Sequence, residues 1–249
     1  MATPYYQDEQ VTLYLGDCRE LLPELGLQAD LVCTDPPYGE TSLPWDRWPD
    51  RWTTLAATTA SSMWCFGSMR MFLQHGAEFT AAGWKLSQDV VWEKPNGTGF
   101  ATDRFRRVHE HALHWYRGPW QAVHQDVPRE QWHGASSKRV NKRTSAGEHT
   151  GAIASAGYDS DTRLARSVMR VANLHQRGAV HPTEKPVGVL DPLIRYGCPQ
   201  GGLVLDLFAG SGSTLDAARQ SGRRAVGIEA NEQYAERAAL RLSQATFAA

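Results

Sequence analysis

The sequence has no long hydrophobic run and little cysteine. Its uninterrupted apolar stretches are far shorter than the roughly 20 residues that a membrane-spanning helix needs. The amino terminus also lacks the basic flank and apolar segment of a signal peptide, so we expect a soluble cytoplasmic protein with no membrane partner. The cysteines, Cys18, Cys33, Cys65 and Cys198, form no Cys-x-x-Cys pair. Their spacing predicts buried, reduced thiols, with neither a metal site nor a disulfide framework.

The sequence also has almost no net charge, −1 at pH 7, but the charges are unevenly distributed. Residues 94–180 contain 14 Lys and Arg against 7 Asp and Glu, together with seven of the nine histidines. Residues 1–93 contain 5 against 13, and residues 181–249 contain 7 of each. A local cationic segment in a neutral protein predicts a polyanionic partner that meets one face. The alternative interpretation is an ordinary solvated charged insertion.

The apolar pattern alternates between strands and helices, which is typical of an α/β protein with a largely parallel sheet. Strands are predicted over residues 11–15, 29–34, 62–66, 86–92, 108–116, 203–208 and 224–229. Helices are predicted over residues 18–25, about 50–61, about 68–82, about 213–221 and 231–243. The strand at 108–116 is expected to pair with 86–92. Residues 118–165 show little periodicity and predict a long loop or a small irregular subdomain.

A glycine turn follows one of the predicted buried strands. Residues 203–214 run from Leu-Val-Leu-Asp-Leu-Phe-Ala through Gly210-x-Gly212 to a predicted helix start. Such a turn lets the backbone approach a ligand closely, and the amides of a helix amino terminus suit an anionic group. Three hydroxyls accompany it, on Ser211, Ser213 and Thr214. Glu229 ends the next strand about 20 residues after Gly210, where this architecture places an acid on ribose hydroxyls. By itself the turn indicates a nucleoside-containing cofactor, and a purely structural turn is the alternative.

The tetrapeptide Asp35-Pro36-Pro37-Tyr38 directly follows another predicted buried strand. Two prolines prevent further ladder pairing, so this segment is a loop at the carboxyl end of the strand, where open α/β sheets bind ligands. A rigid turn with a capping aspartate is the structural alternative.

The residue types of this loop suit methylation of an exocyclic base amine. Such an amine is a poor nucleophile because its lone pair is delocalised into the ring, and acceptors aimed at its N–H groups draw that density back to nitrogen. The Asp35 carboxylate and the Pro36 carbonyl are suited to this task, and the prolines fix their geometry. Tyr38 offers an aromatic face to a base that must be flipped out of the duplex.

These motifs resemble the DNA amino-methyltransferases of restriction-modification, phage and orphan bacterial systems. The catalytic loop precedes the cofactor loop, as in the β group of that family. Further segments are similar to family motifs: Leu-Gly-Asp-Cys at 15–18, residues 89–96 and 106–110, His-Pro-Thr-Glu-Lys-Pro at 181–186, and Gly-Ile-Glu at 227–229. The resemblance implies a Rossmann-like class I S-adenosylmethionine-dependent methyltransferase fold. Its sheet would be mixed but mostly parallel, with helices on both faces and a circularly permuted motif order.

The resemblance also implies an organisation for the chain. Residues 1–117 would form the catalytic half of the methyltransferase domain and 181–249 the cofactor-binding half, with a basic target-recognition insertion at 118–180. The implied cofactor is S-adenosylmethionine. Its expected contacts are Asp17, Cys18, Asp35, His181, Thr183, Lys185, Asp206, Phe208, Ala209, Gly210, Ser211, Gly212, Ser213, Thr214, Glu229 and Ala230. The expected DNA contacts are Arg106, Arg107, Arg129, Lys138, Arg139, Lys142 and Arg143, for which ordinary solubility is the alternative.

The expected activity is site-specific methylation of N6 of adenine in double-stranded DNA, with Asp35, Pro36, Pro37 and Tyr38 as the catalytic residues. Cytosine N4 methylation is the nearest alternative. In the β group that the chain resembles, Ser replaces the Asp in many cytosine enzymes, so Asp35 favours adenine without excluding cytosine. A non-catalytic DNA-binding module and an RNA methyltransferase are less favoured. A homodimer and a cognate restriction endonuclease are the expected partners. Trp45, Trp48 and Trp52 are interpreted as core residues in preference to a lip of the base pocket.

Overall fold

The computed structural model describes residues 2–98, 102–131, 162–171 and 184–245. The chain divides into two compact units, one formed by Met1–Asp126 with Arg166–Ala249 and the other by Val127–Ala165. In the smaller unit, β7 (Arg129–Gln131) pairs antiparallel with β8 (Thr162–Leu164). This unit is shorter at both ends than the 118–180 insertion expected from the sequence.

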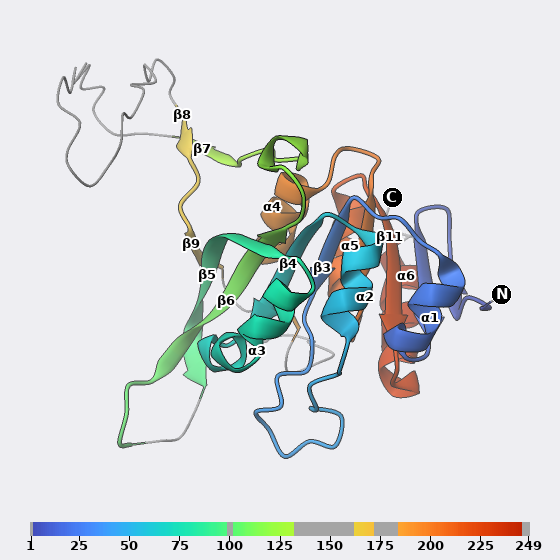
Figure 1. The fold of residues 1–249 in the computed structure, drawn as a ribbon, viewed down its shortest axis with the longest axis horizontal. Helices are drawn as coiled ribbons and strands as arrows, with labels where there is room; N and C mark the ends of the chain where they lie inside the picture. The colour runs from blue at the N-terminus through green and yellow to red at the C-terminus, as the bar shows by residue number, and fades with distance from the viewer. Residues whose placement is uncertain (1, 99–101, 132–161, 172–183, 246–249) are drawn as a thin grey trace. The chain divides into compact units, whose positions relative to one another are not determined.

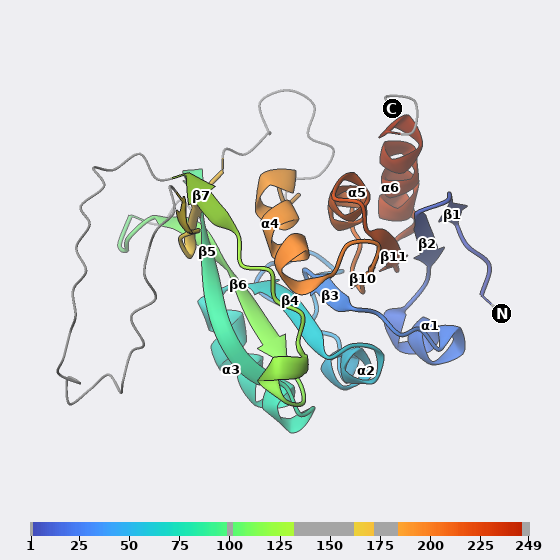
Figure 2. The same ribbon diagram turned by 90° about the horizontal axis from the view of Figure 1, so that it is seen from above.

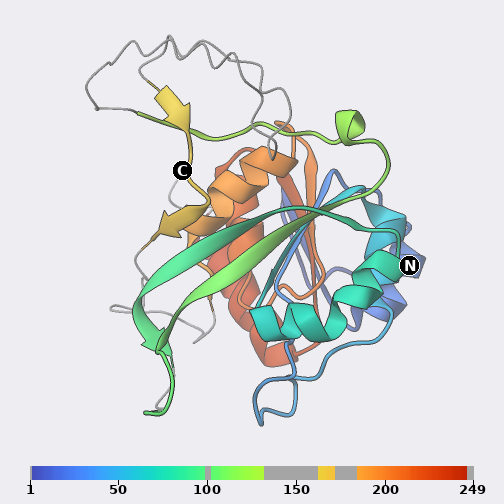
Figure 3. The same ribbon diagram turned by 60° about the vertical axis from the view of Figure 1, so that its left-hand side comes forward.

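The described part of the larger unit is built on one nine-stranded sheet in the order β1-β2-β11-β10-β3-β4-β6-β5-β9 (Figure 1). Its strands are β1 (Tyr6–Gln7), β2 (Val11–Leu15), β3 (Leu31–Thr34), β4 (Ser62–Gly67), β5 (Lys85–Thr98), β6 (Arg107–Tyr116), β9 (Val168–Arg170), β10 (Leu203–Asp206) and β11 (Arg224–Glu229). The five strands from β2 to β4 in this order are mutually parallel. In the long β5–β6 hairpin, seen in Figure 3, β6 pairs antiparallel with both β4 and β5, and β9 pairs parallel to β5.

Helices cover both faces of this sheet (Figure 2). One face carries α1 (Cys18–Leu25), α2 (Trp52–Thr59) and α3 (Met69–Ala81), whose apolar side chains form one buried cluster with the sheet. The other face carries α4 (Val187–Gly197), α5 (Ser213–Gln220) and α6 (Glu232–Ala245), which form a second cluster. A short 3-10 helix, η1 (Trp120–Ala122), follows β6. The predicted α/β fold, a mixed and mostly parallel sheet between two helical layers, is confirmed.

Strands β3 and β10 lie side by side although about 170 residues separate them in the chain. Val204 pairs with Leu31 and Leu205 with Val32 in parallel register. The Asp35 loop and the glycine turn therefore leave the same edge of the sheet from neighbouring strands. This is the arrangement in which open α/β sheets bind ligands.

The element boundaries differ from the sequence predictions in a few places. Strands 29–34 and 203–208 are shorter than predicted, at Leu31–Thr34 and Leu203–Asp206, whereas β5 extends to Thr98. Helix α4 and strand β9 are additional elements. The four cysteines are free and buried, as predicted. In the described ranges, no helix is long and apolar enough to cross a membrane.

Candidate active site

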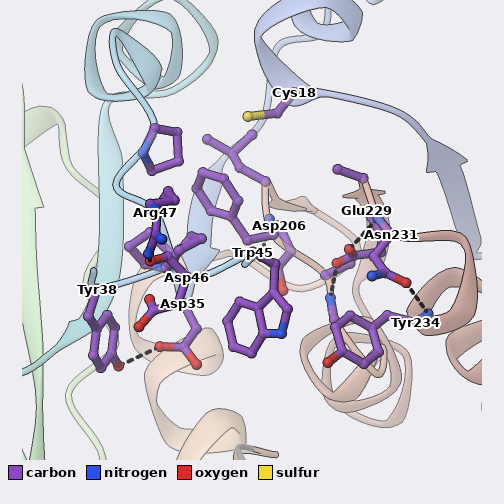
Figure 4. A pocket seen from close by; sticks show the side chains of 18 of the residues that line it. Cys18, Asp35, Tyr38, Trp45, Asp46, Arg47, Asp206, Glu229, Asn231 and Tyr234 are labelled. Atoms are coloured by element: carbon purple, nitrogen blue, oxygen red, sulfur yellow. Dashed lines mark hydrogen bonds between the residues drawn. The ribbon is translucent and has the colours of Figure 1, made fainter. Parts of the chain in front are cut away.

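A cavity of about 670 Å³ opens at the carboxyl ends of β2, β3, β10 and β11. Its size is typical of small-molecule and cofactor sites. Figure 4 shows Asp35 and Tyr38 at one side of it and Glu229 and Asn231 at the other. The lining residues are Gly16, Asp17, Cys18, Arg19, Asp35, Pro36, Pro37, Tyr38, Thr41, Trp45, Asp46, Arg47, Trp48, Pro49, Asp50, Glu110, Glu184, Lys185, Asp206, Leu207, Phe208, Ala209, Gly210, Ser211, Ser213, Thr214, Glu229, Ala230, Asn231 and Tyr234.

The Asp35 carboxylate is held from two sides. The Tyr38 hydroxyl donates a hydrogen bond of 2.6 Å to Oδ1 (Figure 4), and the Lys185 ammonium group donates to Oδ2. Burial, together with the Asp35 charge, raises the pKa of Tyr38 well above its usual value, so the phenol remains a donor. Each carboxylate oxygen has a second lone pair. Asp35 can therefore accept one more hydrogen bond from a donor in the cavity.

Lys185 belongs to a chain of alternating charges behind Asp35. Its Nζ atom lies 3.4 Å from Oε2 of Glu110, and Oε1 of Glu110 accepts a hydrogen bond from Lys94. Burial opposes the ionisation of Glu110, but the two ammonium groups outweigh it and lower the pKa of Glu110 to about 2. Burial likewise opposes the charge of Lys185, and the two carboxylates raise its pKa above the usual value. Glu110 and Lys185 are therefore both charged near neutral pH.

Asp46 organises the loop that follows the tetrapeptide. Its buried carboxylate accepts hydrogen bonds from the backbone amides of Gly39 at 2.8 Å, Glu40 at 3.0 Å and Thr41 at 2.7 Å. Burial would raise the pKa of Asp46, but these hydrogen bonds lower it below the usual value. Glu40 in turn accepts from Ser68 at the start of α3. The segment that directly follows the tetrapeptide is thus held by Asp46 and by Ser68.

The three tryptophans of this loop have different environments. Trp52 is fully buried and belongs to the core under α2 and α3. Trp48 stacks on His75 with a centroid distance of 4.0 Å and donates a 2.9 Å hydrogen bond to Glu78, while also lining the cavity. Trp45 is 37% exposed and lines the cavity, 6.2 Å edge-to-face from Tyr234. The core interpretation is therefore correct for Trp52 and wrong for Trp45.

The glycine turn and Glu229 form the opposite wall. Gly210 and Gly212 adopt left-handed φ values of 52° and 77°, which explains the choice of glycine at both positions. The carboxylate of Glu229 accepts 2.7 Å hydrogen bonds from the amides of Gly210 and Asn231. Burial raises the pKa of Glu229. Its remaining lone pairs face a cavity in which ligand hydroxyls can donate to them.

The end of β2 contributes Asp17 and Cys18. The Asp17 side chain caps α1 by accepting a 2.8 Å hydrogen bond from the amide of Arg19, whose guanidinium also pairs with Asp17 and Asp50. This Arg19 pairing and the capping bond outweigh burial and lower the pKa of Asp17. Burial raises the pKa of the Cys18 thiol to about 12, so the thiol is neutral near pH 7.

The donor and acceptor groups of this cavity fit S-adenosylmethionine. Glu229 supplies acceptors for ribose hydroxyls, and the turn at Gly210 leads into the amino terminus of α5, which suits a carboxylate. Oε2 of Glu184 is buried and has no hydrogen-bond partner in the described part of the chain, although Oε1 pairs with Arg241. An unsatisfied buried carboxylate oxygen in a cavity wall is an acceptor for a ligand ammonium group.

The structure gathers thirteen of the expected cofactor contacts in this cavity wall: Asp17, Cys18, Asp35, Lys185, Asp206, Phe208, Ala209, Gly210, Ser211, Ser213, Thr214, Glu229 and Ala230. Gly212 is not among the residues that line the cavity, and it is the N-cap residue that precedes α5. His181 and Thr183 lie outside the described residues.

The expected DNA contacts are distributed over both units. Arg107 lies 3.5 Å from Glu40, next to the catalytic loop, and Arg106 is exposed beside it. In the smaller unit, Arg129 donates a 2.9 Å hydrogen bond to Thr162. Lys138, Arg139, Lys142 and Arg143 lie outside the described residues. Within the described ranges, no cluster of three His, Cys, Asp or Glu could hold a metal ion.

Several lining residues were not singled out by the sequence. Glu110 lies inside a segment that resembles a family motif, but only the fold brings it to Lys185. Asn231 and Tyr234 follow Glu229 closely, so their proximity to the strand end is the signal that could have identified them. Asp46 has no comparable signal, because its partners are backbone amides.

Comparisons with known proteins agree with this geometry. The family model described as DNA methylase, of the N6/N4 methyltransferases, matches residues 29–240. The chain is 24% identical over 283 residues to Type II methyltransferase M2.DpnII of Streptococcus pneumoniae, covering 97% of this chain and 93% of that protein. Among solved structures, the M1.HpyAVI-SAM complex has a TM-score of 0.64 at 21% identity, covering 93% of this chain and 99% of that one.

The PvuII DNA methyltransferase, which is cytosine-N4-specific, has a TM-score of 0.67 at 16% identity, covering 96% of this chain and 89% of that one. At these identities the two structures support the fold. The family match covers far more than half of the chain, and it contains both the Asp35 loop and the glycine turn. This protein belongs to the N6/N4 DNA methylase family.

Proposed function

We propose that this chain transfers a methyl group from S-adenosylmethionine to N6 of adenine in a flipped-out base of double-stranded DNA. The observation that carries the proposal is the Asp35 carboxylate, held by Tyr38 and Lys185 at the wall of a cavity that Glu229 closes on the other side. The same cavity thus offers Asp35 as an acceptor for a base amine and Glu229 as an acceptor for the hydroxyls of a nucleoside.

The residues of the tetrapeptide would prepare the amine for attack. Asp35 has an available lone pair on each oxygen, so it can accept from one amine N–H while its present partners stay in place. The Pro36 carbonyl is proposed as the acceptor for the second N–H. Together they localise the lone pair on nitrogen before transfer, and Asp35 stays next to the proton that the amine must lose afterwards.

The cofactor would be held by Glu229, Glu184 and the turn around Gly210. When bound, S-adenosylmethionine supplies an electrophilic methyl group on a sulfonium sulfur, which leaves as a neutral thioether. Trp45 and Trp48, in the cavity wall, exclude water and offer aromatic faces to a base. Tyr38 donates its hydroxyl proton to Asp35, so in this geometry its first task is to hold that carboxylate.

Methylation of cytosine N4 is the second candidate. A carboxylate and a carbonyl that accept from an exocyclic amine serve cytosine as well as adenine, and the cytosine-N4-specific PvuII enzyme shares this fold. Asp35 favours adenine, because Ser replaces it in many cytosine enzymes that this chain resembles.

The experiment that separates these activities is a product analysis. The protein is incubated with cofactor labelled on the methyl group and, in parallel reactions, with plasmid DNA or with RNA, and each product is digested to nucleosides and separated. Label in N6-methyl-2′-deoxyadenosine from the DNA is expected. Label in N4-methylcytosine would replace the adenine assignment, whereas unlabelled DNA beside labelled RNA would contradict the DNA substrate. No label in either would favour a non-catalytic DNA-binding module.

The partner assignments are also proposals. A restriction endonuclease partner is supported by the name of M2.DpnII, a Type II methyltransferase. Dimerisation is proposed from the β-group resemblance and can be measured by light scattering. A cytoplasmic location stays a prediction from the sequence.

A further inference from the structure

The charge chain behind Asp35 consists of Lys185, Glu110 and Lys94, which come from three separate elements. Lys185 directly precedes Pro186 and α4, Glu110 lies on β6, and Lys94 lies on β5. With Asp35 at the end of β3, the four charges alternate in sign and sum to zero. Their side chains are between 6% and 26% exposed. Such a group is stable only when each charge keeps its partner.

Lys185 is the centre of this chain. Its ammonium group contacts Asp35 and Glu110 and lies 5.2 Å from the centroid of the Phe66 ring, so carboxylates and an aromatic face surround it. Its backbone is restricted to extended geometry by Pro186, which begins the rigid turn into α4. A flexible side chain on a fixed backbone, buried among fixed partners, has little freedom to move.

We propose that Lys185 is a positioning residue that fixes the orientation of the Asp35 carboxylate, and that Glu110 and Lys94 hold Lys185 in place. This inference rests on the proposed function, because it concerns the acceptor of that reaction. Lys185 donates a charge-assisted hydrogen bond to Oδ2 of Asp35, and Tyr38 donates a 2.6 Å hydrogen bond to Oδ1. Rotation of the carboxylate plane would therefore break at least one of these two hydrogen bonds. The free lone pairs of Asp35 are then aimed into the cavity before the base arrives.

The same geometry argues against Lys185 as a direct contact of the cofactor. Its ammonium group is already engaged by two carboxylates and is only 6% exposed at the side chain. Glu184, its neighbour in sequence, has the available acceptor oxygen instead. A positioning role therefore predicts lost turnover with retained cofactor affinity.

The first experiment compares Lys185→Met and Lys185→Arg with the wild type, and uses Lys85→Met, an exposed lysine on β5, as the matched control. Lys185→Met is expected to lower kcat by about 100-fold, the cost of misplacing one reacting group. We expect the cofactor Kd from calorimetry and the KM for DNA to change by less than about threefold, because neither depends on the carboxylate orientation. Lys185→Arg should recover at least about tenfold of the lost kcat, since it keeps the cation. A kcat within about twofold of wild type in Lys185→Met, or a loss confined to cofactor Kd, would overturn the proposal.

Lys185→Met leaves two buried carboxylates without their shared cation, so the variant can lose stability as well. Glu110 keeps its contact with Lys94 in this variant, whereas Asp35 loses its cation. Thermal unfolding of Lys185→Met is therefore measured beside kcat, and kcat is taken at a temperature well below the unfolding midpoint, where it is expected to stay about 100-fold lower. A wild-type kcat in the fully folded variant would show that Lys185 only stabilises the fold, and would contradict the positioning role.

A readout without turnover completes the test. The free energy of unfolding is measured in urea for Asp35→Asn, Lys185→Met and the double variant that combines these two substitutions. Direct contact predicts that the double variant loses less stability than the two single losses together. Additive losses would overturn the inference. If instead the losses are coupled but wild-type protein methylates no DNA, the proposed function fails while the contact stands.

Discussion

The hydroxyl of Thr34 donates a 2.8 Å hydrogen bond to Oδ1 of Asp206, a residue 172 positions further along the chain. Thr34 immediately precedes Asp35, and Asp206 ends the strand before the glycine turn. The same Asp206 oxygen accepts from the amide of Phe208 at 3.1 Å. This buried contact ties the Asp35 loop to the glycine turn at the adjoining ends of β3 and β10.

The buried Asp206 makes stability depend on pH. Burial raises its pKa to about 6, although the hydrogen bonds from Thr34, Thr214 and Phe208 oppose this shift. In the unfolded chain the carboxyl has its ordinary pKa of about 4. The folded state therefore holds the proton more tightly, and the associated stability is present below about pH 4 and is lost as pH rises through about 6.

We expect Asp206→Asn to remove this dependence. The amide remains neutral and its oxygen can still accept from Thr34, so the variant should lose less stability than the wild type between about pH 4 and pH 6. The difference is at most about 3 kcal/mol, from a pKa shift of about two units. Urea unfolding of both proteins across this window measures it. Parallel pH profiles would show that Asp206 does not titrate in this range.

The sheet and its two helical layers could be predicted from the sequence because the apolar residues of each strand and helix recur with the period of that element. The runs at Val11–Leu15, Ser62–Gly67 and Arg224–Glu229 were predicted within a residue of their observed bounds. The pairing of β5 with β6 was also predicted and is confirmed. These features are local, or follow from simple hairpin topology.

Helix α4 is not among the predicted elements, although its apolar residues recur at helical spacing. Its signal is weakened by two prolines, Pro186 at the start and Pro192 inside the helix. Pro192 removes one backbone donor, which ordinarily disfavours a helix. Burial of Val189, Leu190 and other residues of this helix against the sheet offsets that cost, and such tertiary stabilisation is not visible in the local pattern.

The charge chain at Asp35 could not be predicted for a different reason. The strand order β3-β4-β6-β5 brings Glu110 on β6 and Lys94 on β5 near Asp35 at the end of β3. Lys185 reaches them from the segment before α4. A sequence shows which residues follow a strand, but it does not show which side chains of distant strands reach one another. Asp35 and Glu229 were identifiable because each stands at the end of a strand with a recognisable neighbouring motif.

Asp35→Asn tests the acceptor chemistry of the catalytic loop. The amide has nearly the shape of the carboxylate but less negative charge, and its nitrogen would present N–H groups to the amine. Turnover is expected to fall by about 10²–10³-fold, as for loss of one preorganised electrostatic contact.

Steady-state kinetics with labelled cofactor measures kcat, and calorimetry checks that the cofactor Kd changes by less than about threefold. Asp191→Asn, on the surface of α4, is the matched control. Near-wild-type turnover in Asp35→Asn would refute the role of this carboxylate.

Glu229→Gln tests the opposite wall of the cavity. The carboxylate accepts from two backbone amides and has lone pairs left for ligand hydroxyls. Loss of charge-assisted hydrogen bonds of about 1.5–3 kcal/mol predicts roughly 10–100-fold weaker cofactor binding. Calorimetric titration measures the change, with Glu232→Gln at the exposed start of α6 as the control. An unchanged Kd in Glu229→Gln would place the nucleoside elsewhere in the cavity.

The basic segment gives a prediction about DNA that does not depend on turnover. Lys138, Arg139, Lys142 and Arg143 lie outside the described residues, but their charges belong to the segment with 14 Lys and Arg against 7 Asp and Glu. If they contact phosphates, each releases about one counterion on binding, and log K falls with log salt by about 0.9 per contact.

Replacing all four by Gln should weaken DNA binding and flatten this slope by up to about 3–4. Fluorescence anisotropy at several salt concentrations measures both quantities. The control is Arg224→Gln with Arg237→Gln, two exposed cations on β11 and α6. If the quadruple variant keeps the wild-type slope, these four residues serve solubility, and the phosphate contacts must come from other cations such as Arg106 and Arg107 beside the catalytic loop.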